Sequence, residues 1–480
     1  MKNKPYLCVK FNLENMQILS LTLENFRCFE RLELKLSPQF NVLIGENGSG
    51  KSAVMDALAK AIGNAFPTNA VGGLTPSLPV PQKEDKDIRY LFSDKGKETI
   101  LADKVKVGYI LSDGQSHTFD YKEAHSWNQT LLAKTKTLLL AAKAGENVNL
   151  PIFAYYPANR NWQTKNAANA KDYERGSRLE GYKDWFQPNV STDFVISWVK
   201  NRESADLQQN KRNGNGGKAF EMSLLRQVAQ NCIPNCEEVY YDFDETQLML
   251  KIKGEAKEED NSKPSEEVKG KEKCESKEED NAESKEENSG KVEGKTLPFN
   301  LLSSGFQNMF AIVMDLVFRC ARLNPHLREN ACKESEGIVL IDELDLHLHP
   351  NWQKRIVGDL QKSFPKLQFI VTTHSPFIIQ DVPKSQIQVL NQQKAEMPKF
   401  EPNLLTPDSI FTMIQGVEDI ETQERTTKIE ELASLDILML ALKKEGKESS
   451  PEMQQYWNKF REIAQELNWE TIFINTNDTS

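Results

Sequence analysis

The stretch Gly45-Glu46-Asn47-Gly48-Ser49-Gly50-Lys51-Ser52 decides the fold. It follows residues 40–44, a run that is apolar except for Asn41, and leads into helix-forming sequence from Lys51 to about Ala65. In a strand, glycine loop and helix of this kind, backbone N–H groups wrap the phosphates of a nucleotide. The lysine reaches the β- and γ-phosphates, and the serine hydroxyl ligates Mg²⁺. We therefore expect ATP and Mg²⁺ as cofactors, bound by Asn47, Gly48, Ser49, Gly50, Lys51 and Ser52.

Two acids, Asp342 and Glu343, follow another apolar run, residues 338–341. Phosphoryl transfer depends on positioning and on stabilisation of charge, and a P-loop ATPase needs such acids at the end of a buried strand. We expect Asp342 and Ser52 to hold the metal. Glu343 is expected to orient or deprotonate the attacking water.

Two further segments complete the predicted site. The apolar run 369–371 ends in Thr372-Thr373-His374-Ser375, and a histidine at the C-terminal edge of a strand can contact the γ-phosphate and sense its loss. Residues 302–307, Leu-Ser-Ser-Gly-Phe-Gln, precede helical sequence and so form a helix N-terminus suited to an anion. The predicted catalytic residues are Glu343, Lys51 and His374, and Ser303 and Gly305 join the predicted nucleotide contacts.

The order of the elements predicts an α/β fold with a mixed, mainly parallel sheet and flanking helices. Residues 17–36 read as strand, turn and strand, and helical stretches on both sides of Asn213–Gly217 predict a short inserted hairpin. Helical patterns at 422–444 and 451–467 predict a C-terminal extension, whose second helix packs on the core or offers a partner surface. The expected divisions are an N-terminal extension (1–15), a first ATPase lobe (16–160), a helical insertion (161–236), a second lobe (237–390) and a C-terminal helical region (391–480).

The net charge of −10 comes mostly from one low-complexity tract. Residues 255–290 hold fourteen acids against seven lysines, a net of −7, which leaves −3 for the rest of the chain. Such a composition cannot bury enough apolar surface to offset its ordering entropy. We therefore expect a disordered loop that interrupts the second lobe over residues 255–294, with a binding tail as the other interpretation. The acidic total does not exclude a nucleic-acid partner.

Other features bound the class of protein. No apolar run approaches the length of a membrane helix, and residues 1–15 lack the apolar core of a signal peptide, so we expect a cytoplasmic protein without a membrane span. Seven scattered cysteines fit a reducing compartment. Cys232 and Cys236 lack a second Cys/His pair nearby, which favours a loop or partly buried pair over a zinc site.

With these residues in view, the chain resembles RecF, SMC and related ABC-type ATPases. Asn25-Phe26-Arg27-Cys28-Phe29 is similar to their amino-terminal signature, and residues 302–307 are similar to their ABC signature, departing from Leu-Ser-Gly-Gly-Gln at Ser304 and Phe306. The likeness covers about residues 16–390, apart from the acidic tract. It implies the fold of an ABC-type P-loop ATPase head and a phosphate contact for Arg27. In this family the signature faces the ATP of the other subunit, so a homodimer or a higher even oligomer is implied.

The run 342–350, Asp-Glu-Leu-Asp-Leu-His-Leu-His-Pro, resembles small RecF-like ATPases of bacterial antiphage systems, including OLD-type nucleases and the PtuA subunits of Septu and retron systems. OLD-type proteins carry a further TOPRIM nuclease domain, whereas about 105 mostly helical residues follow His374 here. The resemblance is therefore to PtuA, and it implies a separate HNH-type nuclease subunit similar to PtuB. It also implies that Asp345, His347 and His349 lie in a dimer-facing loop, with a metal role for the two histidines as the alternative.

The expected function is thus an ATPase subunit, converting ATP and water to ADP and phosphate, whose dimer regulates a partner nuclease in antiphage defence. The alternatives are a DNA repair or chromosome-maintenance ATPase that acts directly on DNA, and a binding module that uses ATP as a clamp.

Two further assignments stay open at this stage. Arg160 follows the apolar run 152–156 and is a possible phosphate contact, while no Q-loop glutamine can be identified. A basic and aromatic cluster could track a nucleic-acid backbone, but interspersed acids make a solvated face an equal interpretation. Its members are Arg160, Trp162, Lys165, Lys171, Tyr173, Arg175, Arg178, Tyr182 and Lys183, and the acids are Asp172, Glu174 and Glu180.

Overall fold

The computed structural model describes most of the chain outside its termini and long loops. The described residues are 16–63, 85–92, 99–102, 104–120, 129–158, 160, 178–182, 185–186, 192–213, 220–253, 295–391, 394–413, 422–444, 446–447 and 450–467. The predicted N-terminal extension, the acidic tract and the glycine-rich turn between the two inserted helices lie outside them.

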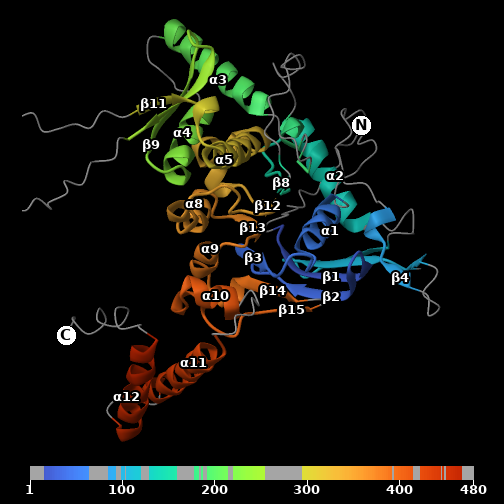
Figure 1. The fold of residues 1–480 in the computed structure, drawn as a ribbon. Coiled ribbons are helices and arrows are strands. Elements are labelled where there is room, and N and C mark those ends of the chain that lie inside the picture. The colour runs from blue at the N-terminus through green and yellow to red at the C-terminus, as the bar shows by residue number, and fades with distance from the viewer. Residues whose placement is uncertain are drawn as a thin grey trace, which may run out of the picture.

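A six-stranded sheet forms the centre of the fold, in the order β15-β14-β3-β13-β12-β8 (Figure 1). All neighbours pair in parallel except β14 and β15. Every residue of β3, β8, β12 and β13 is buried, as expected for parallel strands that are covered on both faces. The predicted mixed, mainly parallel sheet is confirmed. Its strands are β3 (Phe40–Ile44), β8 (Ile152–Tyr156), β12 (Gly337–Ile341), β13 (Leu367–Thr372), β14 (Ile387–Asn391) and β15 (Lys394–Glu396).

A four-stranded antiparallel sheet, in the order β2-β1-β6-β7, is tied to the central sheet. The side-chain amide of Gln368, in β13, accepts a hydrogen bond from the Ile18 N–H at 2.8 Å and donates to the carbonyls of Ile18 and Ser37. Helix α1 (Lys51–Gly63) contacts β1 and β6 and is buried along almost its whole length. The strands are β1 (Ile18–Phe26), β2 (Phe29–Lys35), β6 (Lys106–Leu111) and β7 (Ser116–Asp120), and β4 (Tyr90–Phe92) pairs separately with β5 (Thr99–Leu101).

The inserted helices lie against a third sheet and against the long helix α5 (Ser304–Leu323) (Figure 1). Helices α3 (Thr192–Asn213) and α4 (Phe220–Cys232) occupy the predicted helical hairpin, and α2 (Gln129–Lys143) precedes them. A β-hairpin follows them, formed by β9 (Cys236–Asp242) and β10 (Gln247–Ile252). A third strand, β11 (Lys295–Pro298), follows the acidic tract in the sequence and pairs with β10.

Short helices connect the strands of the second half. Two of them, α7 (Pro350–Gln353) and α8 (Ile356–Ser363), are separated by a turn. The other short helices are α6 (Ala331–Glu334), α9 (Pro376–Gln380) and α10 (Pro407–Met413).

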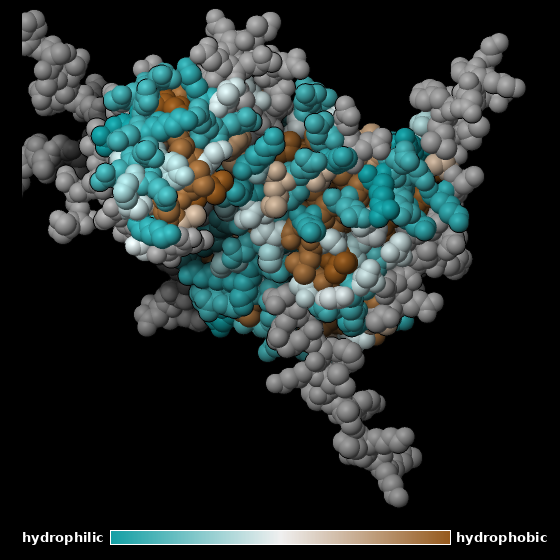
Figure 2. Space-filling model, turned by 90° about the horizontal axis from the view of Figure 1, so that it is seen from below, coloured by the Kyte–Doolittle hydropathy of each residue, from teal (hydrophilic) through white to brown (hydrophobic). Residues whose placement is uncertain are grey.

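The C-terminal extension is a pair of helices, α11 (Thr422–Lys444) and α12 (Pro451–Glu466), at the edge of the molecule (Figure 1). The Ser450 hydroxyl caps α12 by accepting from the Met453 N–H, and Pro451 fits the first helical turn. Phe460, Ile463 and Ala464 are buried, and the helix that α12 chiefly contacts is α11, so this face of α12 packs within the helix pair. Figure 2 shows the molecule from below the view of Figure 1, with hydrophobic side chains among hydrophilic ones on this surface. In α11, the side chains of Ile437, Leu438 and Leu440 are exposed. Within the described part of the chain, no helix has the length and apolar character needed to cross a membrane.

Candidate nucleotide and magnesium site

The phosphate loop, residues 45–52, links the end of β3 to the start of α1. Gly48 and Gly50 have φ values of 84° and 97°, which residues with a Cβ atom rarely adopt. A Cβ on Gly50 would also lie 2.4 Å from Cζ of Phe29, so the loop requires glycine there. The first N–H groups of α1 have no partner within the helix, and they point to the same loop. This is the geometry expected of a phosphate cradle.

Lys51 is folded back across this loop. Its ammonium donates to the carbonyls of Gly45 and Glu46 at 2.8 and 3.0 Å. Burial lowers the pKa of Lys51, and the carboxylates of Asp342, Glu343 and Asp345 act in the opposite direction. Lys51 therefore lies within electrostatic reach of the acidic segment, as the sequence predicts.

The two predicted metal ligands meet directly. The Ser52 hydroxyl lies 2.9 Å from Oδ2 of Asp342, although 290 residues separate them in the sequence. The other carboxylate oxygen of Asp342 accepts from Thr372 Oγ1 at 2.5 Å, which fixes its orientation. Hard oxygen donors suit Mg²⁺, which commonly takes one or two protein ligands together with waters and substrate phosphates. The described residues contain no group of three or more His, Cys, Asp and Glu side chains that could hold a metal alone, and this donor set fits Mg²⁺.

Glu343 is held in an unusual backbone conformation. Its φ is 52°, in the left-handed region that disfavours residues with a Cβ atom. Its N–H donates to Thr372 Oγ1 at 2.7 Å, and its carbonyl accepts from Arg160 Nη2 at 2.8 Å. The N–H and the carbonyl of Glu343 are therefore both held by hydrogen bonds. These bonds fix the backbone from which the half-buried Glu343 side chain extends.

His374 joins the same pocket at the end of β13. Its N–H donates to Asp345 Oδ1 at 3.3 Å, and the same carboxylate oxygen accepts from Thr373 Oγ1 at 2.5 Å. Burial lowers the pKa of His374, and the positive charge of Lys51 lowers it further. The His374 imidazole therefore lies close to Lys51, and its contact with a γ-phosphate stays a prediction.

The signature segment, residues 302–307, lies at the N-terminus of α5 and contacts the Walker B loop, residues 342–349, of the same chain. A Cβ on Gly305 would lie 2.1 Å from the His347 carbonyl oxygen. Ser303 occupies the N-cap position in an extended conformation and is exposed, and its side chain makes no capping hydrogen bond. The structure thus brings Ser52, Asp342, Glu343 and His374 together, while Ser303 presents its hydroxyl at the surface.

Arg27 has partners other than the predicted phosphate. Its guanidinium pairs with Asp56 at 2.7 Å and with Asp87 at 2.8 Å. Tyr155 also donates to Asp56, at 2.9 Å. Burial opposes the charge of Arg27, but Asp56 and Asp87 raise its pKa overall. A phosphate contact for Arg27 remains a prediction, and it would require Arg27 to exchange at least one of these carboxylates.

Arg160 differs from the sequence interpretation. It is 6% exposed, and its guanidinium donates to Asn308 Oδ1 at 2.8 Å and to the backbone carbonyls of Pro157, Asp342 and Glu343. Arg160 therefore tethers the Walker B loop instead of facing a phosphate. Sequence reasoning also missed Thr372 and Asn308, for which only the neighbouring motifs gave a signal.

The basic and aromatic cluster that includes Arg160 is not confirmed as a nucleic-acid track. Arg178 donates to the carbonyls of Glu146, Val148 and Leu323, and the buried Tyr182 donates to the Pro151 carbonyl. Both side chains therefore bind backbone carbonyls of the protein itself and hold irregular segments near α5. The remaining predicted members, at 162–175 and 183, lie outside the described residues.

The cysteine and histidine alternatives do not form a metal centre within the described structure. Cys232 and Cys236 are buried free cysteines, and burial raises the pKa of Cys232 to about 12. In the Walker B loop His347 is exposed, and His349 caps α7 by accepting from the Asn351 N–H at 3.3 Å. The two cysteines are thus buried, where the sequence favoured a loop or a partly buried pair.

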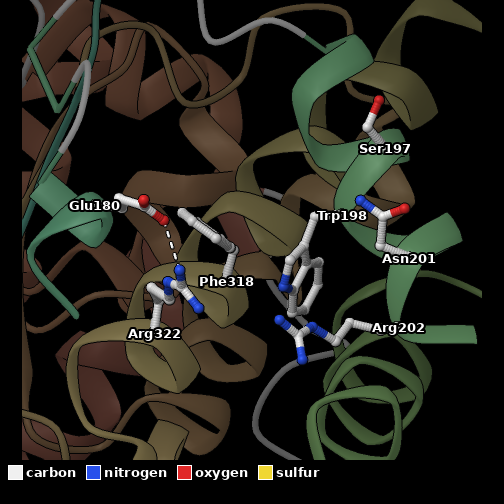
Figure 3. Close-up of a pocket in the computed structure, with 7 residues that line it drawn as sticks. All are labelled: Glu180, Ser197, Trp198, Asn201, Arg202, Phe318 and Arg322. Atoms are coloured by element: carbon white, nitrogen blue, oxygen red, sulfur yellow. Dashed lines mark hydrogen bonds and ion pairs between the residues drawn. The ribbon is translucent and has the colours of Figure 1, made fainter. Parts of the chain in front are cut away.

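A small cavity away from this site lies where α3 meets α5 (Figure 3). The Arg322 and Glu180 side chains pair across one wall at 2.5 Å, and the rings of Trp198 and Phe318 meet edge to face at 5.5 Å. The cavity measures about 20 Å³, room for roughly one water molecule. The side chains around this cavity pack the helical insertion against α5.

Comparison with known proteins places these features in a family context. Residues 16–379 match the family model described as AAA ATPase domain. The "Retron Vc95 probable ATPase" of Vibrio cholerae serotype O1 biovar El Tor is 25% identical over 79% of this chain and 74% of its own length. The "Septu protein PtuA" of Bacillus mycoides is 40% identical over 91 residues, 18% of this chain and 12% of its own. The Smc head domain of Pyrococcus furiosus, solved with an extended coiled coil and bound to the C-terminal domain of ScpA, aligns over 81% of this chain and 97% of its own, with a TM-score of 0.37 and 13% identity.

Proposed function

Because this chain belongs to the AAA ATPase domain family, we propose that it binds ATP with Mg²⁺ and hydrolyses it to ADP and phosphate. The observation that carries the proposal is the meeting of Ser52 and Asp342 at 2.9 Å, between the phosphate loop and Glu343. The parallel strands β3 and β12 end at the same edge of the sheet, and this brings the Ser52 hydroxyl and the Asp342 carboxylate together. Their shared chemistry is the coordination of a hard cation.

The residues of the chain divide the work of phosphoryl transfer. The loop N–H groups and Lys51 hold the phosphates, and Ser52 and Asp342 hold the cation. Glu343 orients the attacking water and accepts its proton, and His374 contacts the γ-phosphate. Mg²⁺, when bound, would neutralise part of the negative charge on the β- and γ-phosphates.

A second copy of the chain would complete each site. The exposed Ser303 and the N-terminus of α5 offer a hydroxyl and helix N–H groups at the surface of the chain, where they could receive a phosphate bound by a second copy. Leu301, beside them, is 70% exposed and would be covered on dimerisation. In the proposed dimer, ATP lies between the phosphate loop of one copy and the signature segment of the other.

The cellular role we propose is regulation of a separate HNH-type nuclease in cytoplasmic antiphage defence. Its support is the likeness to a retron ATPase over most of the chain, together with the local likeness to PtuA. Closure of the dimer on ATP would change the surface offered to the nuclease. Hydrolysis would then reopen the dimer.

Two measurements test the proposal. Purified protein should release phosphate from ATP with Mg²⁺ and stop when EDTA is added. A folded protein that binds ATP without releasing phosphate would reduce the proposal to an ATP-dependent clamp. For the cellular role, the chain should co-purify with the product of a neighbouring nuclease gene, and repair genes in that place would favour a direct role on DNA.

A further inference from the structure

Arg160, which follows β8, connects two segments that the proposed chemistry uses, the Walker B loop and α5. Nη1 donates to the Asp342 carbonyl at 2.5 Å, Nη2 to the Glu343 carbonyl at 2.8 Å, and Nε to Asn308 Oδ1 at 2.8 Å. A buried guanidinium needs such acceptors, because its donors cannot reach water. Burial lowers the pKa of Arg160 to about 10, so the group stays charged at neutral pH. All three nitrogens are therefore committed to the region around the Walker B acids.

The contact with Glu343 matters because of the Glu343 backbone. At φ 52° the residue is in a conformation that its side chain disfavours, so neighbouring groups must hold it there. Thr372 holds the N–H side and Arg160 holds the carbonyl side. Without Arg160, the Glu343 carbonyl would keep the Leu346 N–H at 3.1 Å, and the Leu344 N–H would keep the Thr372 carbonyl at 2.9 Å. The carbonyls of Asp342 and Glu343 would both lose a charged donor, so the carboxylate would be held less firmly in one direction.

Asn308 extends this tether to the signature helix. It lies on α5, one helical turn beyond Gly305, and is 4% exposed. Its amide group accepts from Arg160 and donates to the Leu346 carbonyl at 3.3 Å. A displacement of the N-terminus of α5 therefore reaches the Walker B loop through a short chain of buried hydrogen bonds.

We propose that Arg160 is a positioning residue for Glu343, and that it couples this carboxylate to the signature end of α5 through Asn308. The inference rests on the roles proposed above for Glu343 and Ser303. In the dimer, α5 would contact the ATP of the other copy, so occupation of one site would orient Glu343 in the second. Arg160 itself contacts no substrate.

The first test compares two arginine variants. Arg160→Met removes every donor and keeps the apolar stem. Arg178→Met is the matched control, because all three nitrogens of Arg178 also donate to backbone carbonyls, at the opposite end of α5. Arg160→Met should lower kcat about tenfold to a hundredfold with KM for ATP within about twofold, since misplacement of a catalytic group by about 1 Å has this effect. Arg178→Met should change kcat by less than about twofold. Arg160→Lys keeps one charged donor and should recover part of the lost kcat.

A second variant keeps the idea testable if Arg160→Met does not fold. Asn308→Leu is close in shape and removes the link between Arg160 and α5, together with the contact to the Leu346 carbonyl. Wild-type protein should show cooperative dependence of rate on ATP concentration, and Asn308→Leu should show none, with its rate per site at saturation lowered about threefold to tenfold.

The outcomes separate the inference from the proposed function. A wild-type protein without Mg²⁺-dependent hydrolysis would overturn both. An active wild type would overturn the inference alone if folded Arg160→Met, or Asn308→Leu in its place, kept wild-type kcat and cooperativity. Equal losses of kcat in Arg160→Met and Arg178→Met would also overturn it, since they would show a general structural effect.

Discussion

Gly305 packs directly against the backbone carbonyl of His347, so closely that an added Cβ would lie 2.1 Å from the oxygen. His347 has a φ of 63°, and a turn hydrogen bond from the Leu348 N–H to the Asp345 carbonyl closes this part of the loop. The carbonyl therefore cannot move aside without disturbing the Walker B loop. The helix proposed to face the partner's ATP and the acids that serve the chain's own ATP form one packed unit.

The first prediction concerns this contact. Gly305→Ala should lower the free energy of unfolding by about 1–3 kcal/mol, since inserting a methyl group into a packed contact forces backbone shifts. It should also lower the ATPase rate. Gly358→Ala is the matched control, because Gly358 lies in α8 with no atom within 4 Å of its Cβ position, and it should be neutral or slightly stabilising. Urea unfolding of both variants measures the difference, and equal effects would contradict the close contact.

Thr372 is the second test of the site. Its hydroxyl donates to Asp342 and accepts from the Glu343 N–H, so Thr372→Val removes both contacts with little change of shape. Buried groups left without partners cost about 1–3 kcal/mol each, and the Mg²⁺ concentration needed for half-maximal activity should rise. Thr135→Val serves as control, because the buried Thr135 hydroxyl bonds only to the Leu131 carbonyl in the same helix. Unchanged Mg²⁺ dependence in Thr372→Val would argue against Asp342 as a ligand.

Ser52 and Arg160 show which parts of the candidate site could be predicted from the sequence and which could not. The roles of Ser52, Asp342 and His374 follow from short motifs, because each chemical group needs a strand or loop immediately beside it in the chain. The structure brings these groups together where the sequence predicts. The tether from Arg160 to Glu343 spans 183 residues, and it depends on β8 lying beside β12, which no local pattern specifies. Arg27 shows the same limit, since Asp56 and Asp87 hold it through contacts that the motif does not contain.

The third prediction addresses the composite site. Glu343→Gln keeps the shape of the side chain and removes its ability to accept a proton, so ATP binding should persist and turnover should fall by at least about a hundredfold. The protein should then accumulate as a closed dimer with ATP, detected by mass measurement during size-exclusion chromatography. Lys51→Ala is the control, because it should lose ATP binding and remain in the state seen without nucleotide. An unchanged mass for Glu343→Gln with ATP would remove the two-copy model.

The fourth prediction concerns pH. Burial, followed by the charge of Lys51, lowers the pKa of His374. A histidine with a lower pKa in the folded state binds more protons when unfolded, so its cost to stability is absent well above about pH 6.5, grows as the pH falls from there to the folded pKa, and is constant below it. Urea midpoints at about pH 7.5 and about pH 5.5 should therefore differ less for His374→Gln than for wild type. His117 and His326, whose pKa values burial also lowers, are present in both proteins and cancel in this comparison.

The last prediction concerns the acidic tract, whose two ends the structure brings together. Ile252, at the end of β10, pairs directly with Lys295 at the start of β11 in an antiparallel register. Such partners lie about 5 Å apart, so a turn of a few residues can join them. Because loop-closure entropy changes only slowly with length, replacing residues 255–290 by a short turn should leave stability nearly unchanged and the ATPase rate within about twofold. Lengthening the tract with a neutral linker is the matched control, and it should likewise leave stability and the ATPase rate nearly unchanged. Loss of ATPase activity only on deletion would show that the tract contributes to the site, and loss of nuclease co-purification alone would make it a binding tail.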